Sequence, residues 1–153
     1  MSDTFLSIIP TDPHWQPNPD GAALTTAFMK KLCPNAAGEP EVHRHDTPAF
    51  VHAGANLETI SCPRCGKQLD LQGWWMPRMD QAYNGNGFSD LRVCTPCCGT
   101  DTTLNDLKYD GACGFASFEV KILNPNKSEL IDEELALIGQ ELGHSVRQVW
   151  AHI

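Results

Sequence analysis

A strict alternation of apolar and polar residues runs through positions 116–122, which read Ala116-Ser117-Phe118-Glu119-Val120-Lys121-Ile122. Successive side chains of a β-strand point to opposite faces, so a period of two is typical of a strand that buries one face. We therefore predict a strand over these seven residues, with the even-numbered side chains in a hydrophobic core.

A helix and a second strand are predicted on the C-terminal side of this strand. Ser128 can cap a helix, and acidic residues fill the first turns, where the helix dipole favours negative charge. Gly143 is a natural stop for this helix. Residues 145–153 then predict a final strand. The apolar stripe of the helix has the spacing i, i+4, i+7, i+11: Ile131, Leu135, Ile138 and Leu142.

The N-terminal third of the chain predicts the same order of elements. Residues 5–9 form a short apolar run that is stopped by a proline and indicates a strand. A helix is predicted over residues 21–33, because Asp20 can cap it and apolar residues recur at helical spacing. Residues 41–52 then form an extended segment, in which Pro48 indicates an edge strand or a bulge.

This order of strands and helices predicts an α+β fold of the ferredoxin-like kind, β-α-β/β-α-β, with both helices on one face of an antiparallel sheet. The cysteine-rich segment, about residues 54–112, falls between the second and third of these strands, and we predict that it is an inserted zinc-ribbon module. A chain of 153 residues with 41% hydrophobic residues can fill one core, so residues 1–153 are predicted to form a single domain.

Five of the seven cysteines lie in this segment, and four of them form two Cys-x-x-Cys pairs. That spacing places two thiolates on one cation, and four sulfurs complete the tetrahedral shell that zinc prefers. We predict a structural Zn²⁺ ion that is bound by Cys62, Cys65, Cys94 and Cys97. Cys98 is the alternative to Cys94 or Cys97, and iron is the alternative cation. Standard spacing favours Cys94 and Cys97.

Two other uses of these cysteines are disfavoured. A thioredoxin-like redox pair opens a helix, whereas Gly66 and Gly99 directly follow the cysteines here and disfavour a helix. Buried free thiols do not explain the paired spacing. Because four cysteine ligands leave no coordination position for water, the metal is predicted to stabilise the module and not to take part in a reaction.

Four short motifs of the chain are informative together: Cys62-Pro63-Arg64-Cys65, Trp74-Trp75, Pro96-Cys97-Cys98-Gly99 and Gly114-Phe115-Ala116. With these motifs the chain resembles a group of small uncharacterised bacterial zinc-ribbon proteins with no established activity. The resemblance covers most of residues 50–153 and implies a bacterial, intracellular zinc-ribbon protein. If the Pro-Cys-Cys-Gly element of that group binds the metal, Cys98 becomes more favoured as a ligand.

The charge of the chain disfavours one class of partner. Eleven basic and 19 acidic side chains give a net charge of −8, whereas nucleic-acid-binding proteins carry basic surfaces. The clustered cysteines indicate a reducing compartment, and no apolar run is long enough to span a membrane. With no signal-peptide pattern at the N-terminus, we expect a cytoplasmic protein that does not contact a membrane.

Candidate catalytic residues are few. His43, His45 and His52 raise the hypothesis of a second metal or proton-transfer site, but no fourth ligand or nucleophile accompanies them at a typical spacing. An exposed strand is the preferred interpretation. Of the adjacent Trp74 and Trp75, one is predicted to lie in the core of the insertion. No hydrolase or metalloprotease motif is present. Because the predicted metal site is closed by four cysteines, the chain is predicted not to be an enzyme.

Three functions follow from these observations. The first is a non-enzymatic binding protein, such as an immunity or adaptor protein, whose acidic surface docks a basic protein partner. The second is a nucleic-acid-binding zinc ribbon. The third is an enzyme that uses the histidines or a thiol. The second would use the basic residues of the insertion, which are Arg64, Lys67, Arg78, Arg92 and Lys108.

Overall fold

The computed structural model describes residues 3–52, 57–83, 87–110 and 113–152. It is a mixed α+β structure in which the strands form antiparallel sheets. The largest sheet has four strands in the order β2-β8-β1-β9. The bounds of these strands are Glu41–Val51 for β2, Gly114–Leu123 for β8, Thr4–Pro10 for β1 and Val146–His152 for β9.

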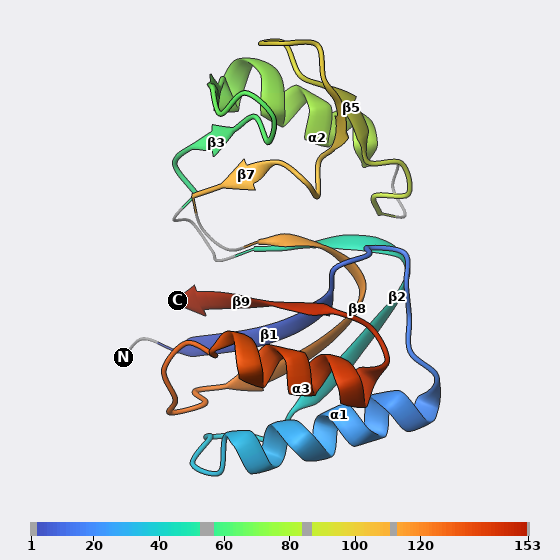
Figure 1. The fold of residues 1–153 in the computed structure, drawn as a ribbon, viewed down its shortest axis with the longest axis vertical. Helices are drawn as coiled ribbons and strands as arrows, with labels where there is room; N and C mark the ends of the chain where they lie inside the picture. Colours follow the sequence, from blue (N-terminus) through green and yellow to red (C-terminus); the bar gives the residue numbers. More distant parts are fainter. Residues whose placement is uncertain (1–2, 53–56, 84–86, 111–112, 153) are drawn as a thin grey trace.

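Two helices, α1 (Pro19–Leu32) and α3 (Asp132–Leu142), pack against each other on one side of this sheet (Figure 1). On β8, Phe118, Val120 and Ile122 belong to the core that these helices cover, and Phe118 and Val120 are fully buried. Ala116 is also buried, in a separate small cluster with Ile9 and Val149. The predicted strand over residues 116–122 and the predicted burial of its even-numbered face are therefore confirmed. Among the described residues, no helix is both long enough and apolar enough to cross a membrane.

The helix caps differ from the predicted ones. Helix α1 begins at Pro19, and the side-chain oxygen of Asn18 accepts a hydrogen bond from Gly21 N at 2.8 Å, so that Asp20 lies within the first turn. Helix α3 begins at Asp132, and the Glu134 carboxylate accepts a hydrogen bond from the Ile131 backbone N–H. The predictions of Asp20 and Ser128 as caps were wrong by two and three residues. Asn18 supplies the cap of α1, whereas the N-cap position of α3 is Ile131, which has no capping side chain, and Glu134 binds its N–H instead.

The cysteine-rich segment has its own small sheets and helices. Strands β4 (Gln68–Leu69), β3 (Ile60–Ser61) and β7 (Lys108–Tyr109) form one sheet, and β5 (Arg92–Cys94) and β6 (Asp101–Thr103) form a hairpin. A π-helical turn, η1 (Leu71–Trp75), leads into helix α2 (Met76–Ala82). The sequence patterns did not predict these helical residues. Trp75 is buried and Trp74 is half-buried, as expected for one core tryptophan.

A second hydrophobic core lies on the side of the four-stranded sheet that faces away from α1 and α3 (Figure 1). The cysteine-rich segment supplies most of it, including the fully buried Ile60 and Leu104. Strand β8 contributes Phe115, whose ring lies 4.9 Å from that of Phe50 in β2 and 5.1 Å from that of Phe88. These aromatic contacts join the cysteine-rich segment to the sheet.

Candidate metal centre

Two short turns of the cysteine-rich segment have the same backbone geometry. In the first, Cys62 N donates to Lys67 O at 2.9 Å and Gly66 N donates to Cys62 O at 3.0 Å. In the second, the N–H of Thr95 donates to Thr100 O at 3.0 Å, and Gly99 N donates to Thr95 O at 3.0 Å.

The glycine of each turn has a left-handed conformation, with φ of 74° at Gly66 and 68° at Gly99. Only glycine adopts this conformation without steric cost, so each glycine fixes the place where its turn closes. The two turns can therefore be matched residue by residue. Cys65 corresponds to Cys98, each directly before its glycine, and the position of Cys62 is taken in the second turn by Thr95.

The structure brings four cysteines together at these turns: Cys62, Cys65, Cys97 and Cys98, whose sulfur atoms all lie within 4.8 Å of one another. The Sγ–Sγ distances are 3.7 Å between Cys62 and Cys98 and 3.4 Å between Cys65 and Cys97. With metal–sulfur bonds of about 2.3 Å, a tetrahedral shell separates its sulfurs by about 3.8 Å. The four thiols are therefore close enough to bind one metal ion.

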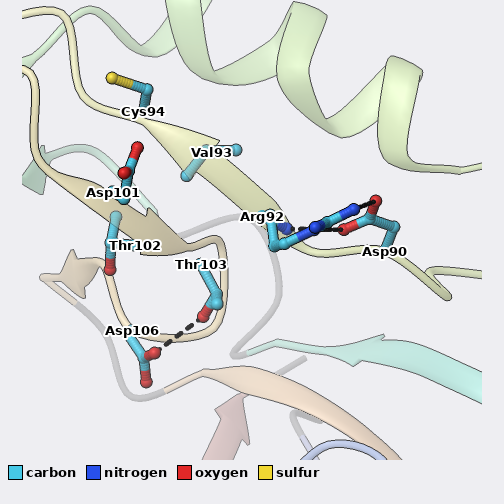
Figure 2. Close-up of a pocket in the computed structure, with 8 residues that line it drawn as sticks. All are labelled: Asp90, Arg92, Val93, Cys94, Asp101, Thr102, Thr103 and Asp106. Atoms are coloured by element: carbon cyan, nitrogen blue, oxygen red, sulfur yellow. Dashed lines mark hydrogen bonds and ion pairs between the residues drawn. The ribbon is translucent and has the colours of Figure 1, made fainter.

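Cys94 is not one of these four residues, although standard spacing favoured it as a ligand. It is the last residue of β5, it is exposed, and its side chain lies in a groove beside Asp101 (Figure 2). Cys98, which the sequence offered as an alternative, has the position before the glycine that a knuckle ligand needs. The sequence contained a signal for this arrangement, because the turns match when they are aligned on Gly66 and Gly99 and not on their first cysteines.

Hydroxyl groups complete the surroundings of the thiols. The Oγ1 atom of Thr95 lies 3.8 Å from Cys62 Sγ and 3.6 Å from Cys98 Sγ, and Thr95 is buried. Thr100 Oγ1 lies 3.0 Å from Cys98 Sγ. A hydroxyl can donate a hydrogen bond to a thiolate, so these threonines favour the charged form of the sulfur, which is the form that binds metals.

The pKa values of the thiols reflect these contacts. The backbone N–H of Cys65, followed by that of Arg64, lowers the pKa of Cys62 to about 6. Hydrogen bonds from Thr100 and Thr95 lower the pKa of Cys98. At Cys65 the N–H of Lys67 acts in the same direction, but the neighbouring thiols, first that of Cys97, outweigh it and raise the pKa to about 11.

The three candidate histidines, two in β2 and His52 directly after it, do not form a second centre. His45 and His52 are exposed, and His43 is half-buried with its Nε2 atom 3.4 Å from the Glu41 carboxylate. The ring of His52 stacks on Phe50 at 5.3 Å. Among the described residues, the four-cysteine group is the one cluster whose ligand atoms converge as a metal site requires. His43 and His45 therefore lie on a strand, as the preferred interpretation of the sequence held, whereas His52 follows the end of that strand.

A groove of about 800 Å³ lies along the β5–β6 hairpin (Figure 2). At one end Asp90 binds the Arg92 guanidinium through both carboxylate oxygens, at 3.0 Å and 2.9 Å, and these hydrogen bonds lower the pKa of Asp90 to about 2. Asp101 and Asp106 also line the groove. An adjoining hollow adds Asp12, so the surface is acidic beyond the balanced Arg92–Asp90 pair.

The comparisons with known proteins add no identity to this geometry. No family model matches the chain, and no curated protein or solved structure matches it either.

The residue-by-residue match between the two turns can be tested by removing one thiol and restoring metal binding with a second substitution. Cys97→Ser should weaken metal binding strongly, because only three thiols of the group remain. Thr95 lies at the position that Cys62 has in the first turn, but it supplies no thiol. Adding Thr95→Cys to Cys97→Ser should restore binding, since the second turn then repeats the Cys-Pro-x-Cys-Gly pattern of the first. Competition with a chromogenic chelator measures both affinities. A double variant that binds no better than Cys97→Ser would show that the turns are not equivalent.

Proposed function

We propose that the protein is a non-enzymatic binding protein, stabilised by zinc, which docks a basic protein partner through its acidic surface. The observation that carries this proposal is the closed group of four thiols. Four sulfur ligands fill the tetrahedral shell of Zn²⁺, so no position is left for a water molecule or a substrate. A metal bound in this way supplies stability and not chemistry.

Zinc is the proposed metal because thiolate ligands in a tetrahedral arrangement suit it, and iron is the alternative that shares this ligand set. The proposed fold is the ferredoxin-like one, supported by the strand order β2-β8-β1-β9 with α1 and α3 on one side. Residues 54–112 would then be an inserted zinc-ribbon module within a single domain over residues 1–153. Reduced cysteines support a cytoplasmic location, and the resemblance to zinc-ribbon proteins supports a bacterial one.

The partner is proposed to be a basic protein, as for an immunity or adaptor protein. The net charge of −8 becomes more negative on metal binding, because four thiolates outweigh the charge of one Zn²⁺ ion. The groove beside β5 and β6 is the proposed docking site for Lys or Arg side chains of the partner, because Asp101 and Asp106 line it. Complementary charge of this kind speeds association and favours the correct partner.

A charge reversal at Asp101 tests the docking place. The partner is first identified from host extract treated with nuclease, by cross-linking and mass spectrometry, and its affinity is then measured with purified proteins. Asp101→Lys should weaken binding at least about tenfold, because like charges oppose each other in the complex. Glu133→Lys changes the net charge equally on α3, away from the groove, and should weaken binding far less.

Two outcomes would contradict the proposal. Equal effects of Asp101→Lys and Glu133→Lys would show that net charge matters and the groove does not. Partners that disappear after nuclease treatment would favour the alternative function, nucleic-acid binding. Arg92, one of the basic residues that this alternative would use, is engaged by Asp90 within the acidic groove.

A further inference from the structure

Strand β9 forms one edge of the four-stranded sheet, and no segment in the described part of the chain pairs with its outer side. It pairs with β1 without a break in register, from Thr4 opposite His152 to Pro10 opposite Val146. β9 contains no proline, and Arg147 is its one residue with a full charge at neutral pH. A regular edge strand of this kind presents unpaired N–H and C=O groups to another strand.

The opposite edge of the sheet, strand β2, is protected. Its register with β8 is interrupted between Arg44 and Ala49. Gln16 Nε2 donates to the carbonyl of His45 at 2.8 Å, and Phe88 N donates to the carbonyl of Pro48 at 2.8 Å. Irregular register, proline and capped carbonyls all prevent strand addition. Within the residues that the structure describes, the outer edge of β9 has none of these protections.

A shallow groove of about 480 Å³ lies beside the start of β9, where α3 runs next to the edge. Small or apolar residues make up most of its lining, and Ala136 is exposed within it. Because these lining side chains are small or apolar, a helix of another molecule can pack against α3 in this groove, beside the edge of the sheet. The residues of the lining used here are Leu135, Ala136, Gly139, Gly143 and Val146.

We propose that β9 pairs in antiparallel fashion with β9 of a second copy of this chain, so that the two four-stranded sheets become one continuous sheet. With Val149 opposite its own counterpart, Arg147 lies opposite the partner's Ala151, and no like charges face each other across the pair. The side of α3 that carries Ala136 and Gly139 then packs against the same side of α3 in the second copy, and this contact covers the groove.

The difference between the two sheet edges explains why we expect a second copy of this chain, and not another protein, to pair with β9. When the β9 edges pair, the edges that remain exposed are the two protected β2 strands, so assembly stops at a closed dimer and does not continue into fibres. A strand paired with itself about a two-fold axis needs no other protein. This inference does not depend on the metal or on the basic partner, and its failure would leave the proposed function untouched.

The oligomeric state of the full-length, metal-loaded protein tests the inference directly. Sedimentation velocity over a range of concentrations should show a reversible monomer–dimer equilibrium. Ala136→Glu places a carboxylate in the groove and should raise the dissociation constant at least about tenfold, because the complex would bury an unpaired charge. Leu137→Glu adds the same charge to α3 outside the groove lining, where Leu137 is 46% exposed, and should leave the equilibrium unchanged.

Substitutions at Ala151 test the register of the pair. Ala151→Arg places two arginines opposite each other in each half of the dimer, and should weaken it about five- to tenfold. Ala151→Glu places a carboxylate opposite the partner's Arg147 and should strengthen the dimer. Thermal unfolding of each variant confirms that it folds. A protein that is monomeric at every concentration overturns the proposal, and so does a dimer that responds to neither the Ala136 nor the Ala151 substitutions.

Discussion

Replacing Cys98 by serine is expected to abolish stoichiometric zinc binding, whereas replacing Cys94 by serine leaves one zinc ion per chain. Cys98 Sγ lies 3.7 Å from Cys62 Sγ and 3.9 Å from Cys97 Sγ, so its loss leaves three thiols in the group. Cys94 lines the groove of the β5–β6 hairpin and contributes no sulfur to the group. The two variants are matched, because each removes one thiol from the β5–β6 hairpin.

The expected effect on stability is large. Structural zinc contributes on the order of 10–16 kcal/mol in small modules, which is comparable to the whole stability of many domains. Because Cys62 is buried in the second core, losing the metal should also loosen the packing around it. We therefore expect Cys98→Ser to lose hydrogen-exchange protection over residues 57–110 and to keep it in β8 and α1.

Metal analysis of the purified variants and exchange measurements decide between the two cysteines. If Cys94→Ser loses the metal while Cys98→Ser retains it, Cys94 is a ligand as its spacing suggested, and the group of four is wrong. Elemental analysis of the unaltered protein also separates zinc from iron, because the coordination shell is the same for both. Iron in place of zinc would contradict the proposed metal but not the proposed ligands.

The sequence predicted much of the four-stranded sheet and its helices because their patterns are local. The alternation over residues 116–122 and the apolar stripe of α3 each report which face is buried. Helix ends are less well determined, since several capping residues are present near each start. Asn18 and Asp20 are both suitable caps for α1, and the choice depends on which side chain reaches Gly21 N.

The cysteine-rich segment was less predictable for a different reason. Its cysteines offer five thiols for four positions, and the choice among them depends on how two turns 33 residues apart meet in space. The helical residues of η1 and α2 have no strong apolar period, and Pro77 lies within them. Their conformation follows from burial of Trp75 in the second core, which is a tertiary contact.

Replacing Phe115 by alanine is expected to destabilise the cysteine-rich segment selectively. Phe115 is fully buried, and its ring contacts Phe50 and Phe88, so its removal leaves a cavity where the segment meets the sheet. A Phe→Ala change at a fully buried position costs about 3–5 kcal/mol. Because the lost contacts are with the second core, the loss should appear first as reduced exchange protection in residues 57–110 and as weaker metal binding.

Phe118→Ala is the matched control, since both residues are buried phenylalanines of β8 and lie three positions apart. The Phe118 ring belongs to the core under α1 and α3, and the Arg44 guanidinium lies 5.2 Å from its centroid. Its loss should lower the free energy of unfolding by a similar amount but reduce protection in the helices, with the metal affinity of the folded protein unchanged. Equal weakening of metal binding by both variants would mean that the two cores unfold as one unit. A change in metal affinity for Phe115→Ala alone would instead show that the β8–β2 surface around Phe115 holds the metal-binding turns in place.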